Sequence, residues 1–131
     1  MIKGSCLCGN VTFELDRTPE LMNICHCPMC RKITGSAYGV FAHIKQEYFH
    51  WLSGIELVSS YVSSAENIRA FCKRCGSSVP NTDDGYMCIP AGSLVDDPDI
   101  TPSFQIFTGS KAPWHDLAPS PKSFLEFNPD D

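Results

Sequence analysis

Long hydrophobic runs are missing from this sequence, and their absence argues against one class of protein. A membrane-spanning helix needs about 18 or more consecutive apolar residues, and no such run occurs among the 131 residues. The first residues also lack the apolar segment and cleavage site of a secretory signal peptide. We therefore expect a protein that stays in the cytoplasm and has no membrane partner.

An excess of positive charge is also absent. The formal net charge is −5 at pH 7, from 15 acidic and 10 basic residues. A protein that binds nucleic acid broadly needs a basic face to neutralise phosphates. We therefore expect no nucleic-acid partner, and nothing in the sequence indicates the oligomeric state.

Helical periodicity is weak, and no repeat, low-complexity tract or long linker divides the chain. A chain of 131 residues fits one domain, residues 1–131, with a buried core. Short β-prone runs lie between frequent glycines and prolines. The predicted strands are residues 10–15, 38–44, 55–62, 67–72, 86–90, 104–107 and 124–127. With only short helical turns expected at 28–33 and 96–100, this spacing predicts an all-β fold.

Eight cysteines are the most informative feature of the composition. In a compartment that keeps thiols reduced, this number indicates metal binding rather than disulfides. Two pairs, Cys6 with Cys8 and Cys72 with Cys75, lie far apart in the sequence. Together they supply the four thiolates of a closed tetrahedral zinc site, which would stabilise the fold. An iron–sulfur cluster on the same four residues is the alternative that the spacing leaves open.

The segment 25–30 contains three more thiols, Cys25, Cys27 and Cys30. Three protein ligands leave one coordination position of a zinc ion open, as in catalytic sites. One alternative is a second closed site, with Cys88 or a histidine such as His43 as the fourth ligand. Another is redox chemistry at the C-x-x-C within this segment, although no βαβ context supports it. Cys88 lies in an apolar run, which favours a buried thiol over a ligand.

A zinc ion held by three thiolates is a weak generator of hydroxide but a good acceptor of another soft ligand. A substrate thiol bound there would have its pKa lowered from about 8.5, and its sulfur would be fixed in place. Arg31 and Lys32 follow the segment and either attract the carboxylates of an acidic thiol or are ordinary solvated charges. The histidines are expected to be surface or half-buried residues rather than ligands: His26, His43, His50 and His115.

Three motifs together resemble one known family. They are GSCLCG at residues 4–9, CHCPMCRK at 25–32 and FCKRCGS at 71–77. The later segments AGSL at 91–94, DDP at 96–98 and SKAPW at 110–114 agree with it. On these motifs the chain resembles the glutathione-dependent formaldehyde-activating enzyme family, which also includes centromere protein V.

The resemblance implies a zinc-containing β-tent fold of small antiparallel sheets. It implies a structural zinc ion on Cys6, Cys8, Cys72 and Cys75, and a catalytic zinc ion on Cys25, Cys27 and Cys30. The implied activity is that of a carbon–sulfur lyase, which reversibly joins formaldehyde and glutathione to S-hydroxymethylglutathione. The expected partners are thus a small thiol such as glutathione and a small aldehyde. The rival interpretation is a non-catalytic zinc module that binds a protein.

Overall fold

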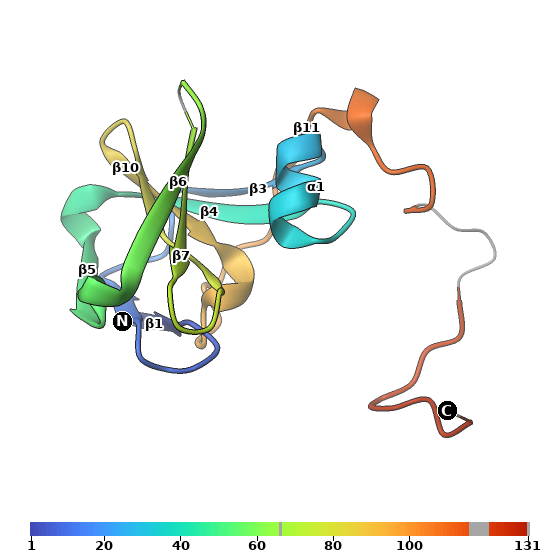
Figure 1. Ribbon diagram of the computed structural model, residues 1–131, viewed down its shortest axis with the longest axis horizontal. Coiled ribbons are helices and arrows are strands. Elements are labelled where there is room, and N and C mark those ends of the chain that lie inside the picture. Colours follow the sequence, from blue (N-terminus) through green and yellow to red (C-terminus); the bar gives the residue numbers. More distant parts are fainter. Residues whose placement is uncertain (66, 116–120, 131) are drawn as a thin grey trace.

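The computed structural model describes residues 1–65, 67–115 and 121–130 of the chain (Figure 1). Three small sheets account for the strands of the described residues. The first sheet has the order β1 (Ile2–Ser5), β2 (Thr12–Leu15) and β5 (Phe49–Ser53). The second has the order β11 (Phe104–Ile106), β3 (Leu21–Cys25), β4 (Gly39–Lys45), β10 (Tyr86–Pro90) and β9 (Asn81–Asp83). The third contains β6 (Val58–Ser64), β7 (Asn67–Cys72) and β8 (Ser78–Val79).

The predicted all-β fold of small sheets with short helical turns is confirmed. One α-helix, α1 (Pro28–Thr34), lies among the described residues, close to the predicted turn at 28–33. Four 3-10 turns complete the described structure: Gln46–Tyr48, Ile55–Leu57, Ala91–Ser93 and Thr108–Ser110. The strands pair antiparallel except β11, which runs parallel to β3. None of the helices in the described ranges has the length and hydropathy needed to span a bilayer.

Two predicted elements are wrong, and a third begins three residues later than expected. Residues 124–127 form no strand, because they are exposed and have no neighbouring strand with which to pair. Residues 96–100 form bends rather than a helical turn, since Asp99 takes a positive φ of 57°. The predicted strand 55–62 starts only at Val58, because Gly54, with a φ of 76°, turns the chain into a 3-10 turn first.

The main hydrophobic core lies between the first and second sheets. Phe13 of β2 and Ile44 of β4 are fully buried there, together with Ile89 of β10. Since side chains alternate along a strand, Phe41 and His43 lie on the opposite face of β4. The β3–β4 register pairs Cys25 with Gly39 and Asn23 with Phe41. Cys25 therefore ends its strand on the face of the second sheet that looks away from this core.

The residues at the two ends of α1 are of types that favour the start and the end of a helix. Cys27 is the N-cap, and its Sγ accepts a hydrogen bond from the Cys30 N–H at 3.3 Å. Pro28 occupies the first turn, where no backbone donor is needed. Gly35 ends the helix with a left-handed φ of 62°. As Figure 1 shows, α1 lies beside β11 at one end of β3 and β4.

Candidate metal centres

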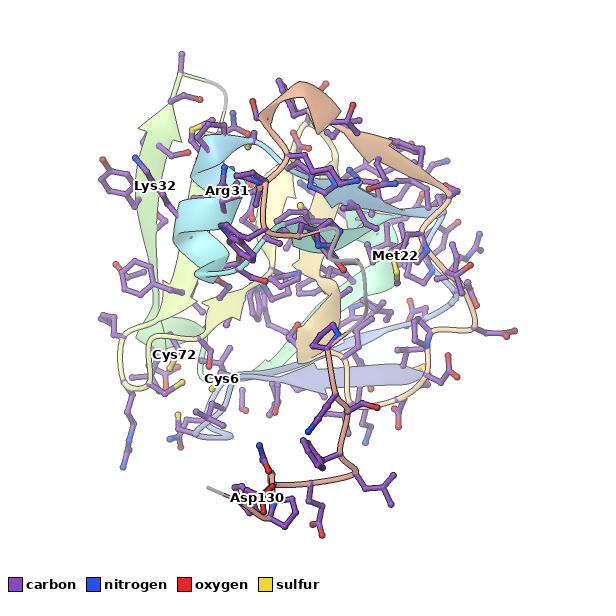
Figure 2. The ribbon with its side chains drawn as sticks, turned by 90° about the vertical axis from the view of Figure 1, so that its right-hand side faces the viewer. Cys6, Met22, Arg31, Lys32, Cys72 and Asp130 are labelled. Carbon is purple, nitrogen blue, oxygen red and sulfur yellow. The ribbon has the colours of Figure 1, made fainter. Side chains whose placement is uncertain are left out.

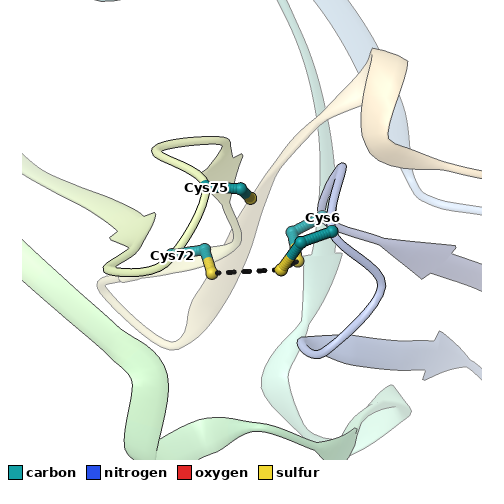
Figure 3. Close-up of side chains that lie close together, drawn as sticks. Cys6, Cys72 and Cys75 are labelled. Atoms are coloured by element: carbon teal, nitrogen blue, oxygen red, sulfur yellow. Dashed lines mark hydrogen bonds between the residues drawn. The ribbon is translucent and has the colours of Figure 1, made fainter.

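The first candidate centre is the four-cysteine cluster, formed by Cys6, Cys8, Cys72 and Cys75. Their Sγ atoms all lie within 4.8 Å of one another, and Figure 3 shows the labelled side chains converging from two separate loops. The Sγ of Cys8 is 3.5 Å from that of Cys6 and 3.9 Å from that of Cys72. Sulfurs about 2.3 Å from a tetrahedral zinc ion lie about 3.8 Å apart. The cluster therefore fits such an ion.

Backbone hydrogen bonds hold the two loops of this cluster in place. Cys6 follows β1 and donates its N–H to the Val11 carbonyl at 3.0 Å. Gly76 donates to the Cys72 carbonyl at 2.8 Å in the left-handed conformation, at a φ of 78°, that favours glycine. The two loops are joined by the Leu7 N–H, which donates to the Ser77 hydroxyl at 2.9 Å. The donor set is thus organised by both halves of the chain.

The local environment also prepares one of these sulfurs for a cation. The hydroxyl and backbone of Ser77 hydrogen-bond to Cys75 and lower the pKa of this thiol to about 5. All eight cysteines are free thiols, so no disulfide competes for the sulfurs. A metal ion needs the deprotonated form of each thiol, and the lowered pKa of Cys75 favours that form at neutral pH.

The second candidate centre is the three-cysteine cluster, formed by Cys25, Cys27 and Cys30. Cys25 ends β3, Cys27 caps α1 and Cys30 lies in the first turn of that helix. Their Sγ atoms lie within 4.8 Å of one another. The three residues are only 6%, 6% and 3% exposed, and Phe41 packs against them. The tight connection from strand to helix thus brings together the three thiols that the sequence singled out.

Burial controls the protonation of the three-cysteine cluster. It raises the pKa of Cys30 to about 12 and also raises the pKa of Cys25. For Cys27 burial acts in the same direction, but hydrogen bonds led by the Cys30 N–H outweigh it and lower the pKa. A cation that binds here must therefore displace protons, so its affinity falls as the pH is lowered.

Neither proposed fourth ligand belongs to this cluster. The group of donors within reach contains three cysteines, and Cys88 and His43 are not among them. Cys88 lies in the middle of β10, where burial raises the pKa of its thiol to about 12. His43 is half-buried, and its Nε2 donates to the Asn23 Oδ1 at 2.8 Å. Within the described residues, the three sulfurs have no fourth His, Cys, Asp or Glu donor.

The prediction that all histidines are surface or half-buried is wrong for His26. This side chain is 0% exposed, and its ring contacts those of Tyr38 and His115 at 5.3 and 5.7 Å between centroids. The Nε2 of its ring hydrogen-bonds to the Gln105 Oε1 at 2.7 Å, and its backbone N–H donates to the Ile106 carbonyl at 3.1 Å. His26 therefore attaches β11 to the three-cysteine segment. Sequence adjacency to cysteines gave no sign of this contact.

The other histidines agree with the prediction. His43 and His115 are half-buried and His50 is exposed. The Nε2 of His50 lies 2.8 Å from the Asp16 carboxylate, on the first sheet. The structure therefore brings no histidine into either group of metal-binding donors among the described residues.

The two basic residues of α1 point to different parts of the molecule. Arg31 donates from Nη1 to the Ser110 carbonyl at 3.2 Å, which attaches the C-terminal part of the chain to the helix. Lys32 is exposed and faces the third sheet (Figure 2).

Arg69 of β7 is a residue that the sequence did not single out. Its Nη2 lies 3.7 Å from the Cys30 Sγ, a contact that arises only when β7 packs near α1.

Comparisons with known proteins support one family. The profile of the family described as "Glutathione-dependent formaldehyde-activating enzyme" matches residues 1–110. An uncharacterized lyase of Schizosaccharomyces pombe is 30% identical over 77 residues, which cover 59% of this chain. The chain spans about half the length of this relative, 54%.

A solved structure shows a similar fold. The crystal structure of a Rhodobacter sphaeroides protein superposes with a TM-score of 0.62 at 20% sequence identity. The match covers 79% of this chain and 98% of that protein. The family profile extends over both cysteine clusters, whose sulfurs lie close together in the structure. The chain belongs to the glutathione-dependent formaldehyde-activating enzyme family.

Proposed function

We propose that this protein is a zinc-dependent carbon–sulfur lyase. Its substrates would be a small, formaldehyde-like aldehyde and a low-molecular-weight, glutathione-like thiol. The proposal rests on a cluster of three buried thiols. Among the described residues, no fourth His, Cys, Asp or Glu lies close enough to these thiols to complete a metal site. Membership of the family supports the same type of chemistry.

Two zinc ions with different roles form part of the proposal. Cys6, Cys8, Cys72 and Cys75 would hold a closed, structural ion, and the sulfur separations of 3.5 and 3.9 Å support this assignment. Cys25, Cys27 and Cys30 would hold the second ion and leave one position for a substrate sulfur. A reducing compartment such as the cytoplasm would keep all these thiols free.

In the proposed reaction, the thiol adds to the aldehyde carbon. A carbon–sulfur bond forms, the carbon–oxygen double bond becomes a single bond, and the thiol proton ends on oxygen. Cleavage is the reverse, and no oxidant or reductant is needed. When bound, zinc would supply a soft Lewis acid that fixes the substrate sulfur and lowers the pKa of its thiol.

The residues of the chain would contribute position and environment. The Cys30 N–H donates to Cys27 and orients one ligand sulfur. Phe41 packs against the cluster and limits the access of water. The β3–α1 connection places all three sulfurs on one short segment, so the ligands are organised before a substrate arrives.

Titration of the cobalt-substituted protein with glutathione tests this function. Cobalt in a thiolate site absorbs visible light, and we expect the spectrum to change and saturate as the substrate sulfur enters the open position. The variant Cys27→Ser, loaded in the same way, provides the control because it lacks one ligand of that site. A spectrum that ignores every thiol offered would contradict the proposal and would favour a closed, non-catalytic module.

A further inference from the structure

Arg69 is a cation without a carboxylate partner among the described residues. Its Nε is buried and has no hydrogen-bond partner, while its Nη2 donates to the Cys30 Sγ at 3.7 Å. The ion pair found among the described residues joins His50 to Asp16, so no carboxylate of this part of the chain pairs with Arg69. A guanidinium remains charged at any pH a protein tolerates, and partial burial of an unpaired charge is costly. Such a group is suited to an anion that comes from outside the chain.

The same side chain lines a cavity next to the cluster. This cavity of about 320 Å³ lies between α1 and the β6–β7 hairpin. The residues lining it are Met29, Lys32, Ile33, Tyr61, Ser63 and Arg69. Among the described residues, this lining includes two cations and two hydroxyls and no acidic side chain, although the chain carries a net charge of −5. Figure 2 shows Lys32 on the side of α1 that faces these strands.

Another cavity along the second sheet has the opposite character. It has a volume of about 470 Å³, and its lining includes Glu20, Asp83 and Asp84. These carboxylates would repel an anionic ligand. Of these two cavities, the one beside α1 is therefore better suited to an acidic substrate.

We infer that Arg69, assisted by Lys32, binds a carboxylate of the thiol substrate and thereby selects acidic thiols of the glutathione class. This inference rests on the proposed function, because it takes the three-cysteine cluster as the place where the substrate sulfur binds. Arg69 contacts Cys30 on one side and the cavity on the other, so it connects the sulfur site to the carboxylate site. The planar guanidinium can bind a carboxylate through two parallel hydrogen bonds. Arg69 is thus a specificity-determining residue, whereas Arg31 is occupied with Ser110.

The test compares glutathione with its diethyl ester, in which both carboxylates are blocked, on the cobalt-loaded full chain. We expect the wild-type protein to bind glutathione more tightly than the ester. In Arg69→Gln the dissociation constant for glutathione should rise about 10- to 100-fold, as expected for a lost charge-assisted hydrogen bond. The constant for the ester should stay nearly unchanged. Lys32→Gln should show a smaller effect of the same kind, and Arg69→Lys should recover part of the affinity.

Lys45→Gln is the matched control, since this exposed lysine at the end of β4 loses the same charge away from the cavity. Its affinities for both ligands should equal those of the wild type. Equal affinity of the wild type for acid and ester, or equal weakening of both by Arg69→Gln, would overturn the inference while leaving the lyase proposal intact. Failure of the wild type to bind either thiol would defeat the lyase proposal and this inference together. If Arg69→Gln does not fold, two other measurements test the inference. They are the ratio of the wild-type dissociation constants for glutathione and its ester, and the affinities of Lys32→Gln for both ligands.

Discussion

Replacing Cys72 with serine is expected to remove most of the soluble, folded protein. Cys72 ends β7, is 0% exposed and belongs to the four-cysteine cluster. The other half of that cluster, Cys6 and Cys8, follows β1, so the proposed zinc ion would join two distant parts of the chain. Binding of a structural zinc ion contributes about 10–16 kcal/mol in small zinc domains, whereas whole domains are stable by about 5–15 kcal/mol. Loss of this ion should therefore leave little stability.

The measurement for this variant is the yield of soluble protein, its circular dichroism and its zinc content. Cys88→Ser is the matched control, because Cys88 is a free thiol outside both clusters. We expect the control to stay soluble with two zinc ions per chain. A folded Cys72→Ser protein that retains both ions would show that the four-cysteine cluster is not the structural centre.

The second large effect concerns Cys27→Ser, which we expect to fold normally and to lose its activity. Its cluster lies within one short segment, residues 25–30, so no distant parts of the chain are joined by it. Serine is also a favourable N-cap, so α1 keeps its first turn. With only two sulfurs left, the second ion should be lost. Metal-ion catalysis supplies several kcal/mol, so the rate should fall about 1,000-fold or more.

The expected readout is one zinc ion per chain, a cooperative unfolding transition in urea and a rate of adduct formation near that of the uncatalysed reaction. Nuclear magnetic resonance of formaldehyde and glutathione mixtures measures this rate directly. If Cys27→Ser lost its fold as completely as Cys72→Ser, the division into a structural and a catalytic centre would be contradicted.

The sequence predicted the three-cysteine cluster and each pair of the four-cysteine cluster because the short spacings between these cysteines are local information. Each short spacing, such as Cys72 to Cys75 around a turn, limits the distance between two sulfurs wherever the loop lies. The alternation of residues 10–15 likewise predicted β2. In contrast, β3 was not predicted, because its burial pattern does not alternate and it ends within the cysteine segment.

The contacts around the three-cysteine cluster could not be predicted from the sequence for a different reason. His26 hydrogen-bonds to Gln105 of β11, which comes from a segment about eighty residues later in the chain and pairs parallel with β3. Arg69 approaches Cys30 only because the third sheet packs near α1. A single arginine in a strand has no local pattern that reveals such a partner. The contacts of His26 and Arg69 depend on tertiary packing, and Arg69 is the residue that we assign to substrate selection.

Zinc anomalous scattering from crystals grown with and without glutathione tests the division of the seven sulfurs most directly. We expect two zinc peaks: one within bonding distance of Cys6, Cys8, Cys72 and Cys75, the other bound by Cys25, Cys27 and Cys30 with a fourth ligand from outside the chain. With glutathione, that fourth ligand should be its sulfur. A second ion enclosed by four protein side chains, or no second ion in zinc-replete crystals, would contradict the account.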